Sequence, residues 1–291
     1  MRILLLGATG MVGRSLLRKL ESDSKLKVVG TTTRKPNQHN LTRFCWPNDP
    51  LDELIKKTSP NIIINLAAKL DSKSLNNNLM ARQDAFSLNS DLPSGLSIFA
   101  DRLKVIHMST DGVFSGINPP YYEKSVTDGE GVYADSKILG EAGLKNGKIL
   151  RCSIIGRSPN PLVSIPNLLL RQPKNAVIPI AENEKWNGVT SDAFAEFTYS
   201  LISNNFLDAM NHVQHITPRF PITKKDLFKE IAKSLGRDDL VFGSIQSERP
   251  RSRILATENS AFLTEVWEKT SFGFVPSIQD MIRATDFKGA L

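Results

Sequence analysis

The chain has 291 residues, 40% hydrophobic and 23% charged, which suits a soluble globular protein with one large α/β domain or a nucleotide-binding domain and a smaller partner. Its formal net charge of +7 comes from Lys and Arg residues that never stand more than two in a row, which argues against a nucleic-acid-binding arm and favours phosphate-bearing small molecules. No apolar run reaches the length of a membrane span or a signal-peptide core, and Cys45 and Cys152 lack metal-ligand spacing, so we expect a cytoplasmic protein with reduced cysteines and no membrane partner.

The N-terminus has the pattern of a strand, a glycine-rich turn and a helix. Residues 3–6 are apolar, glycines follow at positions 7, 10 and 13, and leucines then recur at helical spacing before a second strand. Such a β-α-β unit binds the pyrophosphate of a dinucleotide at the helix N-terminus, because glycines permit a tight turn and a close approach of the backbone. The residues expected to bind the cofactor here are Gly7, Thr9, Gly10, Met11, Val12 and Gly13.

The end of the second strand indicates which dinucleotide is bound. NAD enzymes usually carry an acidic residue there to hold the ribose hydroxyls, but this chain has Thr33, Arg34 and Lys35. An arginine can bind a 2′-phosphate bidentately, whereas an acid would repel it. We therefore expect NADPH (NADP+) as the cofactor. The alternative is that Arg34 and Lys35 are a solvated loop pair.

Strands and helices continue to alternate through the middle of the chain. Strands are expected at 61–68, 104–110 and 148–155, and Pro93 predicts a kink or break in the helix at 84–103. The alternation is typical of an α/β fold with a doubly wound parallel sheet. The first of these strands ends in Asn65, Ala67 and Ala68, and small residues there leave room for a cofactor in the crevice.

Tyr133 and Lys137 stand four residues apart in an expected helix. This spacing puts a phenol and an amine on one helix face, but by itself it also describes many solvated pairs. The context changes its meaning, because Thr110 supplies a hydroxyl at the carboxyl end of the preceding strand, on the crevice side.

These marks together resemble the extended short-chain dehydrogenase/reductase family. The segments GATGMVG, PNIIINLAA, FSLNSDLP, HMSTDGVFSG, VYADSKILGE and KWNGVTS are similar, in order, to those of its dTDP-4-dehydrorhamnose reductase-like nucleotide-sugar reductases. The resemblance implies a Rossmann fold of the extended type and catalytic roles for Thr110, Tyr133 and Lys137. The chain departs from that group at Gly112, where the group usually has an aromatic residue.

The implied roles agree with the chemistry of the side chains. Tyr133 would be the general acid that gives a proton to a carbonyl oxygen as hydride arrives from the nicotinamide. Lys137 would lower the pKa of the phenol toward working pH and hydrogen-bond the ribose, and Thr110 would orient the carbonyl. Asp111, beside Thr110, is expected to bind substrate.

The C-terminal part has less regular alternation and many prolines. We expect residues 1–156 plus 189–217 to form the NADP-binding Rossmann domain, and 157–188 plus 218–291 to form a smaller substrate-binding domain. Three arginines cluster at 249, 251 and 253, and Arg249 and Arg251 are expected to bind the substrate diphosphate. A solvated basic loop is the alternative.

The function expected from these features is NADPH-dependent reduction of the 4-keto group of a nucleotide-activated deoxysugar, for surface polysaccharide synthesis. Two alternatives stay open: an epimerase or dehydratase on the same fold, and a non-catalytic NADP(H)-binding regulatory subunit. A homodimer is a possible assembly. No metal site is expected, because His107, His212 and His215 show no ligand pattern and are interpreted as structural.

Overall fold

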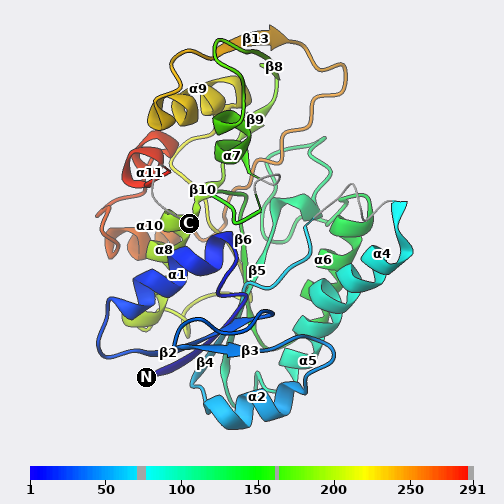
Figure 1. Cartoon of the computed structure of the whole chain (residues 1–291), viewed down its shortest axis with the longest axis vertical. Coiled ribbons are helices and arrows are strands. Elements are labelled where there is room, and N and C mark those ends of the chain that lie inside the picture. Colours follow the sequence, from blue (N-terminus) through cyan, green and yellow to red (C-terminus); the bar gives the residue numbers. More distant parts are fainter. Residues whose placement is uncertain (71–76, 161–163, 288–291) are drawn as a thin grey trace.

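Seven parallel strands form one sheet at the centre of the computed structural model, which describes residues 1–70, 77–160 and 164–287 (Figure 1). Their order is β11-β6-β5-β4-β1-β2-β3, so the chain winds outward from β1 in both directions. Every neighbouring pair is parallel. This is the doubly wound sheet that the sequence predicts. The strands are β1 (Arg2–Leu6), β2 (Lys27–Thr32), β3 (Leu41–Arg43), β4 (Ile62–Asn65), β5 (Lys104–Ser109), β6 (Lys148–Arg151) and β11 (Val213–His215).

Helices cover both faces of this sheet, which explains why its strands are uninterrupted apolar runs. In β1, Ile3 and Leu5 belong to one hydrophobic core, whereas Leu4 and Leu6 belong to the other. Figure 1 shows α1 and α8 on one side of the sheet and α2, α5 and α6 on the other. These helices are α1 (Met11–Glu21), α2 (Leu51–Thr58), α5 (Leu92–Ser97), α6 (Val132–Gly143) and α8 (Ser191–Ser203).

The packing of α1 fixes the glycine turn that precedes it. Its buried residues include Leu16, Leu17 and Leu20, at the helical spacing read from the sequence. The helix lies against α8, where Lys19 pairs with Glu196 at 2.6 Å. The start of α1 is therefore held between the sheet and a second helix, beside the carboxyl end of β1.

The helix expected around Pro93 is interrupted as predicted. α4 (Leu79–Phe86) runs into a π-helical turn, Ser87–Asp91, and α5 begins with Pro93 in its first turn. π turns of this kind often lie at functional positions. The buried Asn89 in this turn donates to Ser136 Oγ on α6 at 3.0 Å, which ties the turn to the helix that carries Tyr133.

The C-terminal part consists of small strand pairs and helices above the sheet (Figure 1). The helices α9 and α11 lie there, whereas α10 packs against α8, where Phe197 and Trp267 have ring centroids 5.0 Å apart. One end of the expected smaller domain thus rests on the nucleotide-binding part. The remaining elements are β7 (Ile154–Ile155), α7 (Ile165–Leu170), β8 (Val177–Ala181), β9 (Lys185–Trp186), β10 (Val189–Thr190), β12 (Ile222–Thr223), α9 (Lys224–Leu235), β13 (Val241–Ile245), α10 (Ser260–Glu268) and α11 (Ile278–Ala284).

Candidate active site

A cavity of about 840 Å³ lies at the carboxyl ends of β1, β4 and β5. This is where doubly wound sheets bind ligands, because the crossovers leave a crevice there. The glycine turn forms one wall, and the residues around Tyr133 form another. Thr110, Tyr133 and Lys137, which are separate in the sequence, all line this one space.

The glycine turn leaves no room for side chains. Gly7 has φ of +79°, and a Cβ at Gly13 would lie 2.1 Å from the Gly7 carbonyl oxygen. Gly10 is the N-cap of α1 and contributes no capping side chain. The first N–H groups of a helix have no intrahelical acceptor, so this end of α1 can bind an anion such as a pyrophosphate.

The structure divides the residues expected to bind the cofactor into two sets. Gly7, Gly10, Met11, Val12, Gly13 and Ala68 line the cavity, as does Leu66, which the sequence reading missed. Thr9 instead accepts a hydrogen bond from Arg14 Nε through its carbonyl oxygen at 3.1 Å. Asn65 and Ala67 lie behind the lining, where the Ala67 N–H donates to Asn65 Oδ1 at 3.1 Å. Leu70 and Asn160, the last described residues before the gaps at 71–76 and 161–163, also line the cavity.

The end of β2 carries no acidic side chain. Thr31 Oγ1 accepts from the Gly7 N–H at 3.1 Å, and Thr32 Oγ1 accepts from the Arg34 N–H at 3.2 Å. The side chains of Thr33, Arg34 and Lys35 are exposed. Within the described residues neither basic side chain forms an ion pair, so both are available to an anionic ligand.

Thr110 is fixed by the turn that follows β5. Its Oγ1 accepts from the Gly112 N–H at 3.0 Å and donates to Asp111 Oδ1 at 3.2 Å. A Cβ at residue 112 would lie 3.3 Å from Tyr133 Cε1. Gly112 therefore lets the Thr110 turn and the Tyr133 ring approach each other closely.

Tyr133 differs from the sequence expectation in its acidity. Burial raises the pKa of its phenol to about 12, against a smaller lowering by the hydrogen bond with Thr110. The sequence reading expected Lys137 to lower this pKa. Burial prevails because the phenolate would lose more solvation than the surrounding groups return. A phenol of high pKa keeps its proton, as a general acid must.

Lys137 is buried, with 2% of its surface exposed. Its Nζ donates to the Met108 carbonyl oxygen at 2.8 Å and lies 3.1 Å from His107 Nε2. Burial lowers the pKa of the amine to about 8. His107 is thus a direct neighbour of a candidate catalytic group, which its interpretation as a structural residue did not foresee.

Asp111 lines the other side of the cavity, and Arg253, which does not line it, lies near enough to act on the Asp111 charge. Burial raises the pKa of Asp111, while Arg253 and the hydroxyls of Thr110 and Ser153 act in the opposite direction. Arg253 Nε donates to the Phe114 carbonyl oxygen at 2.8 Å. Of the three arginines at 249, 251 and 253, Arg253 therefore lies nearest to Asp111, and the sequence prediction did not include it in the substrate site.

Arg249 and Arg251 have a different position. Both are exposed, and neither lines the cavity. Arg251 NH2 lies 3.6 Å from Glu130 Oε2. The expectation that these two side chains bind the substrate diphosphate would require the substrate to extend out of the cavity.

A segment that we call the strap, residues 252–256, passes along this side of the site. Ser252 N–H donates to the Gly116 carbonyl oxygen at 2.9 Å. Tyr121 N–H donates to Ile254 O, and Ala256 N–H donates to Tyr121 O, each at 2.8 Å. These main-chain bonds tie the strap, which carries Arg253, to the loop that follows the Thr110 turn.

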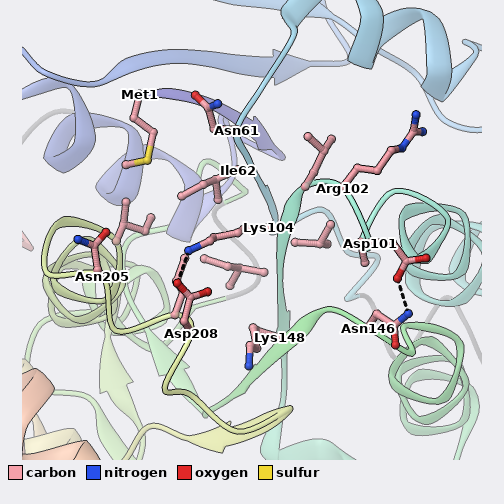
Figure 2. A pocket seen from close by; sticks show the side chains of 16 residues that line it. Met1, Asn61, Ile62, Asp101, Arg102, Lys104, Asn146, Lys148, Asn205 and Asp208 are labelled. Carbon is pink, nitrogen blue, oxygen red and sulfur yellow. Dashed lines mark hydrogen bonds and ion pairs between the residues drawn. The ribbon is translucent and has the colours of Figure 1, made fainter.

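Figure 2 shows a second cavity, of about 480 Å³, at the opposite edge of the sheet, where β4, β5 and β6 begin. An ion pair between Lys104 and Asp208 at 2.8 Å and a hydrogen bond from Asn146 to Asp101 at 2.7 Å lie along it. Its described lining contains no Ser, Thr, Tyr, Cys or His. This cavity therefore has no candidate nucleophile or general acid of those types.

Metal clusters and membrane-spanning helices are both absent from the residues that the structure describes. No group of three or more His, Cys, Asp or Glu side chains lies together as a metal site. None of the described helices combines the length and apolar character needed to cross a membrane.

The chain matches the model of one protein family along nearly its whole length. The family model described as RmlD substrate binding domain matches residues 1–285. The chain belongs to this family. It is thereby an extended short-chain dehydrogenase/reductase, as the sequence motifs imply. The family match includes both the glycine turn and the segment that carries Tyr133 and Lys137.

Solved structures of similar fold cover nearly the whole RmlD-family chain. A dTDP-4-dehydrorhamnose reductase from Clostridium acetobutylicum is 19% identical, with a TM-score of 0.74 and 98% of each chain covered. The enzyme of that name from Bacillus anthracis, in complex with NADP, is 17% identical, with a TM-score of 0.71 and 97% of each chain covered. A mutant of UDP-glucuronic acid 4-epimerase from Bacillus cereus, in complex with UDP-4-deoxy-4-fluoro-glucuronic acid and NAD, has a TM-score of 0.73 at 18% identity, covering 98% of this chain and 97% of its own. These likenesses establish the fold.

Similarity to curated sequences is shorter. The chain is 28% identical over 140 residues to methionine adenosyltransferase 2 subunit beta from Danio rerio, which is 48% of this chain and 42% of that protein. The match to the Rattus norvegicus protein of that name is 28% over 142 residues. The chain thus spans less than half the length of the curated relatives it matches.

Proposed function

We propose that this RmlD-family protein is an NADPH-dependent reductase of the 4-keto group of a nucleotide-activated deoxysugar. The observation that carries the proposal is one cavity in which the glycine turn faces Thr110, Tyr133 and Lys137. Its volume of about 840 Å³ lies within the range of small-molecule and cofactor sites. The membership in a family whose solved relatives include dTDP-4-dehydrorhamnose reductases supports this choice of substrate class.

The residues present fit a nicotinamide dinucleotide. The pyrophosphate would lie at the start of α1, because the glycines there have no side chains and leave space for it. Exposed Arg34 and Lys35 would bind a 2′-phosphate. The solved relative from Bacillus anthracis is in complex with NADP, which supports the same cofactor here.

The side chains then have separable roles in ketone reduction. Bound NADPH would supply a hydride to the carbonyl carbon. Tyr133 gives its proton to the carbonyl oxygen, because a phenol of raised pKa starts the reaction protonated. Thr110, by turning its hydroxyl proton from Asp111 to the substrate, would donate to the same oxygen and orient it. Lys137 hydrogen-bonds the ribose and, in its ammonium form, stabilises the negative charge left on Tyr133.

We further propose where the substrate lies. Residues 157–188 and 218–291 would enclose the nucleotide sugar, with Asp111 and Arg253 close to the sugar. Arg249 and Arg251 would reach only the outer part of the ligand, because they are exposed. The reaction would serve surface polysaccharide synthesis in the cytoplasm. A homodimer is part of the same proposal.

The test is a turnover screen with dTDP-, UDP- and GDP-linked 4-keto sugars and either NADPH or NADH. Steady oxidation of NADPH with one of these substrates is expected, together with a product in which the ketone has become an alcohol. Conversion of a nucleotide sugar to its epimer without net consumption of cofactor would favour the epimerase alternative.

The regulatory alternative has its own observation, the similarity to methionine adenosyltransferase 2 subunit beta. NADP(H) binding without turnover of any of these substrates, for wild-type protein that is folded, would favour that reading over a reductase. The complete set of Thr110, Tyr133 and Lys137 around one cavity favours catalysis.

A further inference from the structure

A chain of buried hydrogen bonds behind the active site runs in one direction. It starts at the Ala67 N–H, which can only donate, and which points to Asn65 Oδ1 at 3.1 Å. The oxygen of the Asn65 amide is thereby fixed on the side of Ala67. Its nitrogen, Nδ2, must then face His107 Nδ1, at 3.2 Å. Since Nδ2 donates, His107 Nδ1 accepts.

The direction of this chain determines the tautomer of His107. The ring is fully buried, and burial, followed by the charge of Lys137, lowers its pKa well below the usual value, against a smaller opposite effect of a hydrogen bond with the Asn65 backbone. His107 is therefore neutral, with one ring N–H. Because Nδ1 accepts, the proton lies on Nε2, and Nε2 is 3.1 Å from Lys137 Nζ.

Two donors cannot satisfy each other, so this arrangement distinguishes the two forms of Lys137. An ammonium has no lone pair to receive the His107 Nε2–H, whereas an uncharged amine has one. The amine can still donate to the Met108 carbonyl oxygen at 2.8 Å. With Lys137 uncharged, every hydrogen bond from Ala67 to Met108 is satisfied.

The other groups around Lys137 do not reverse this preference. Glu141, on the same helix, favours the ammonium, but its carboxylate is held by Arg151 at 2.6 and 2.9 Å. Cys152 lies across the cavity, and burial raises the pKa of its thiol, so it stays uncharged. Tyr133 likewise keeps its proton. Burial of Lys137 itself also disfavours charge.

We propose that His107 is a positioning residue that holds Lys137 in its uncharged form in the resting site, by directing its Nε2–H at the Lys137 amine. The use of this arrangement in catalysis rests on the proposed function. An uncharged Lys137 leaves Tyr133 protonated and ready to act as an acid. Once Tyr133 has given its proton to the substrate oxygen, the phenolate charge favours uptake of a solvent proton by Lys137.

The arrangement can be inverted with a near-isosteric substitution. In Asn65→Asp a carboxylate would face His107 Nδ1 and take the ring proton to that side. His107 Nε2 would then accept from Lys137, and the ammonium would be favoured. In His107→Gln the side-chain oxygen can likewise accept from an ammonium, without an imidazole.

The direct test is nitrogen NMR of the histidine rings in the whole protein without substrate. We expect Nε2 protonated and Nδ1 bare for His107, identified by its loss in His107→Gln. His212 and His215 are internal controls, because their Nδ1 atoms each lie 2.7 Å from a carbonyl oxygen and must carry the proton. An Nδ1–H tautomer or an imidazolium at His107 in the wild type overturns the proposal.

The second readout is the ionisation of Lys137, followed by its ¹³Cε signal and assigned by its loss in Lys137→Arg. Burial brings the pKa of this amine to about 8 even though Glu141 and Cys152 act in the opposite direction, and the His107 N–H should bring the wild-type midpoint below that. Asn65→Asp and His107→Gln should each raise the midpoint by one pH unit or more. Equal midpoints in the wild type and a folded variant would contradict the proposal. If neither variant folds, a wild-type midpoint at or above pH 8 would contradict it.

Neither measurement depends on turnover. A protein with the expected tautomer and midpoint but no reductase activity would refute the proposed function and leave the hydrogen-bond chain intact. An active reductase with the opposite tautomer would refute only the role of His107.

Discussion

Substitution of Tyr133 by Phe removes the proposed acid and little else. The ring remains packed with Val132 against the α4 residues Ala81 and Ala85. The lost hydroxyl leaves no orphaned partner, because Thr110 keeps its bonds to Asp111 and to the Gly112 N–H. Loss of one ordinary hydrogen bond costs about 0.5–1.5 kcal/mol of stability. Removal of general acid catalysis should lower the rate roughly 10²–10⁴-fold.

The assay separates binding from chemistry. NADPH affinity is measured by fluorescence titration, and single-turnover reduction is followed with the substrate found by the screen. Tyr133→Phe should bind NADPH close to normally and reduce the ketone at 1% of the wild-type rate or less, by the roughly 10²-fold lower bound. Tyr122→Phe is the matched control, because Tyr122 is 41% exposed and outside the cavity. If Tyr133→Phe kept a rate within a few fold of Tyr122→Phe, the phenol would not be the acid.

Three further predictions concern the cofactor, the substrate and the fold. NADPH should bind more tightly than NADH, and Arg34→Ala should remove most of the difference, since a charge-assisted contact contributes roughly 1.5–3 kcal/mol; equal wild-type dissociation constants would exclude this role. Arg253→Ala should raise the KM for the sugar nucleotide more than Arg249→Ala or Arg251→Ala, because only Arg253 faces Asp111, and a ranking in the reverse order would place the diphosphate outside the cavity. Glu141→Gln should reduce the free energy of unfolding by about 3–5 kcal/mol in a denaturant titration, because it leaves the buried Arg151 guanidinium without its carboxylate. A loss below about 1 kcal/mol would show that the pair is solvated.

The parts of the fold that follow from local patterns could be predicted from the sequence. The apolar run at the start of β1, the glycines after it and the leucines of α1 each act within a few residues, and together they fix the first β-α-β unit. The α6 pair Tyr133 and Lys137 is also local, since a helix puts positions four apart on one face.

The parts that could not be predicted depend on contacts across the fold. His107 faces Asn65 because β4 and β5 pair in that register, and it faces Lys137 because α6 crosses the end of β5. Arg253 reaches the Phe114 carbonyl oxygen from 139 residues away in the chain. The raised pKa of Tyr133 comes from burial, which spacing in a sequence does not reveal.

The backbone attachment of the strap bears on how this site can diversify. Its hydrogen bonds to Gly116 and Tyr121 use main-chain atoms, which every residue type other than proline provides in full. Two side-chain bonds add to them, from the Lys185 N–H to Ser252 Oγ and from Arg253 Nε to the Phe114 carbonyl oxygen, each at 2.8 Å. A substitution at either position therefore removes one bond and leaves the main-chain bonds in place. Substrate preference could evolve there by single substitutions, without loss of the geometry that performs the proton transfer.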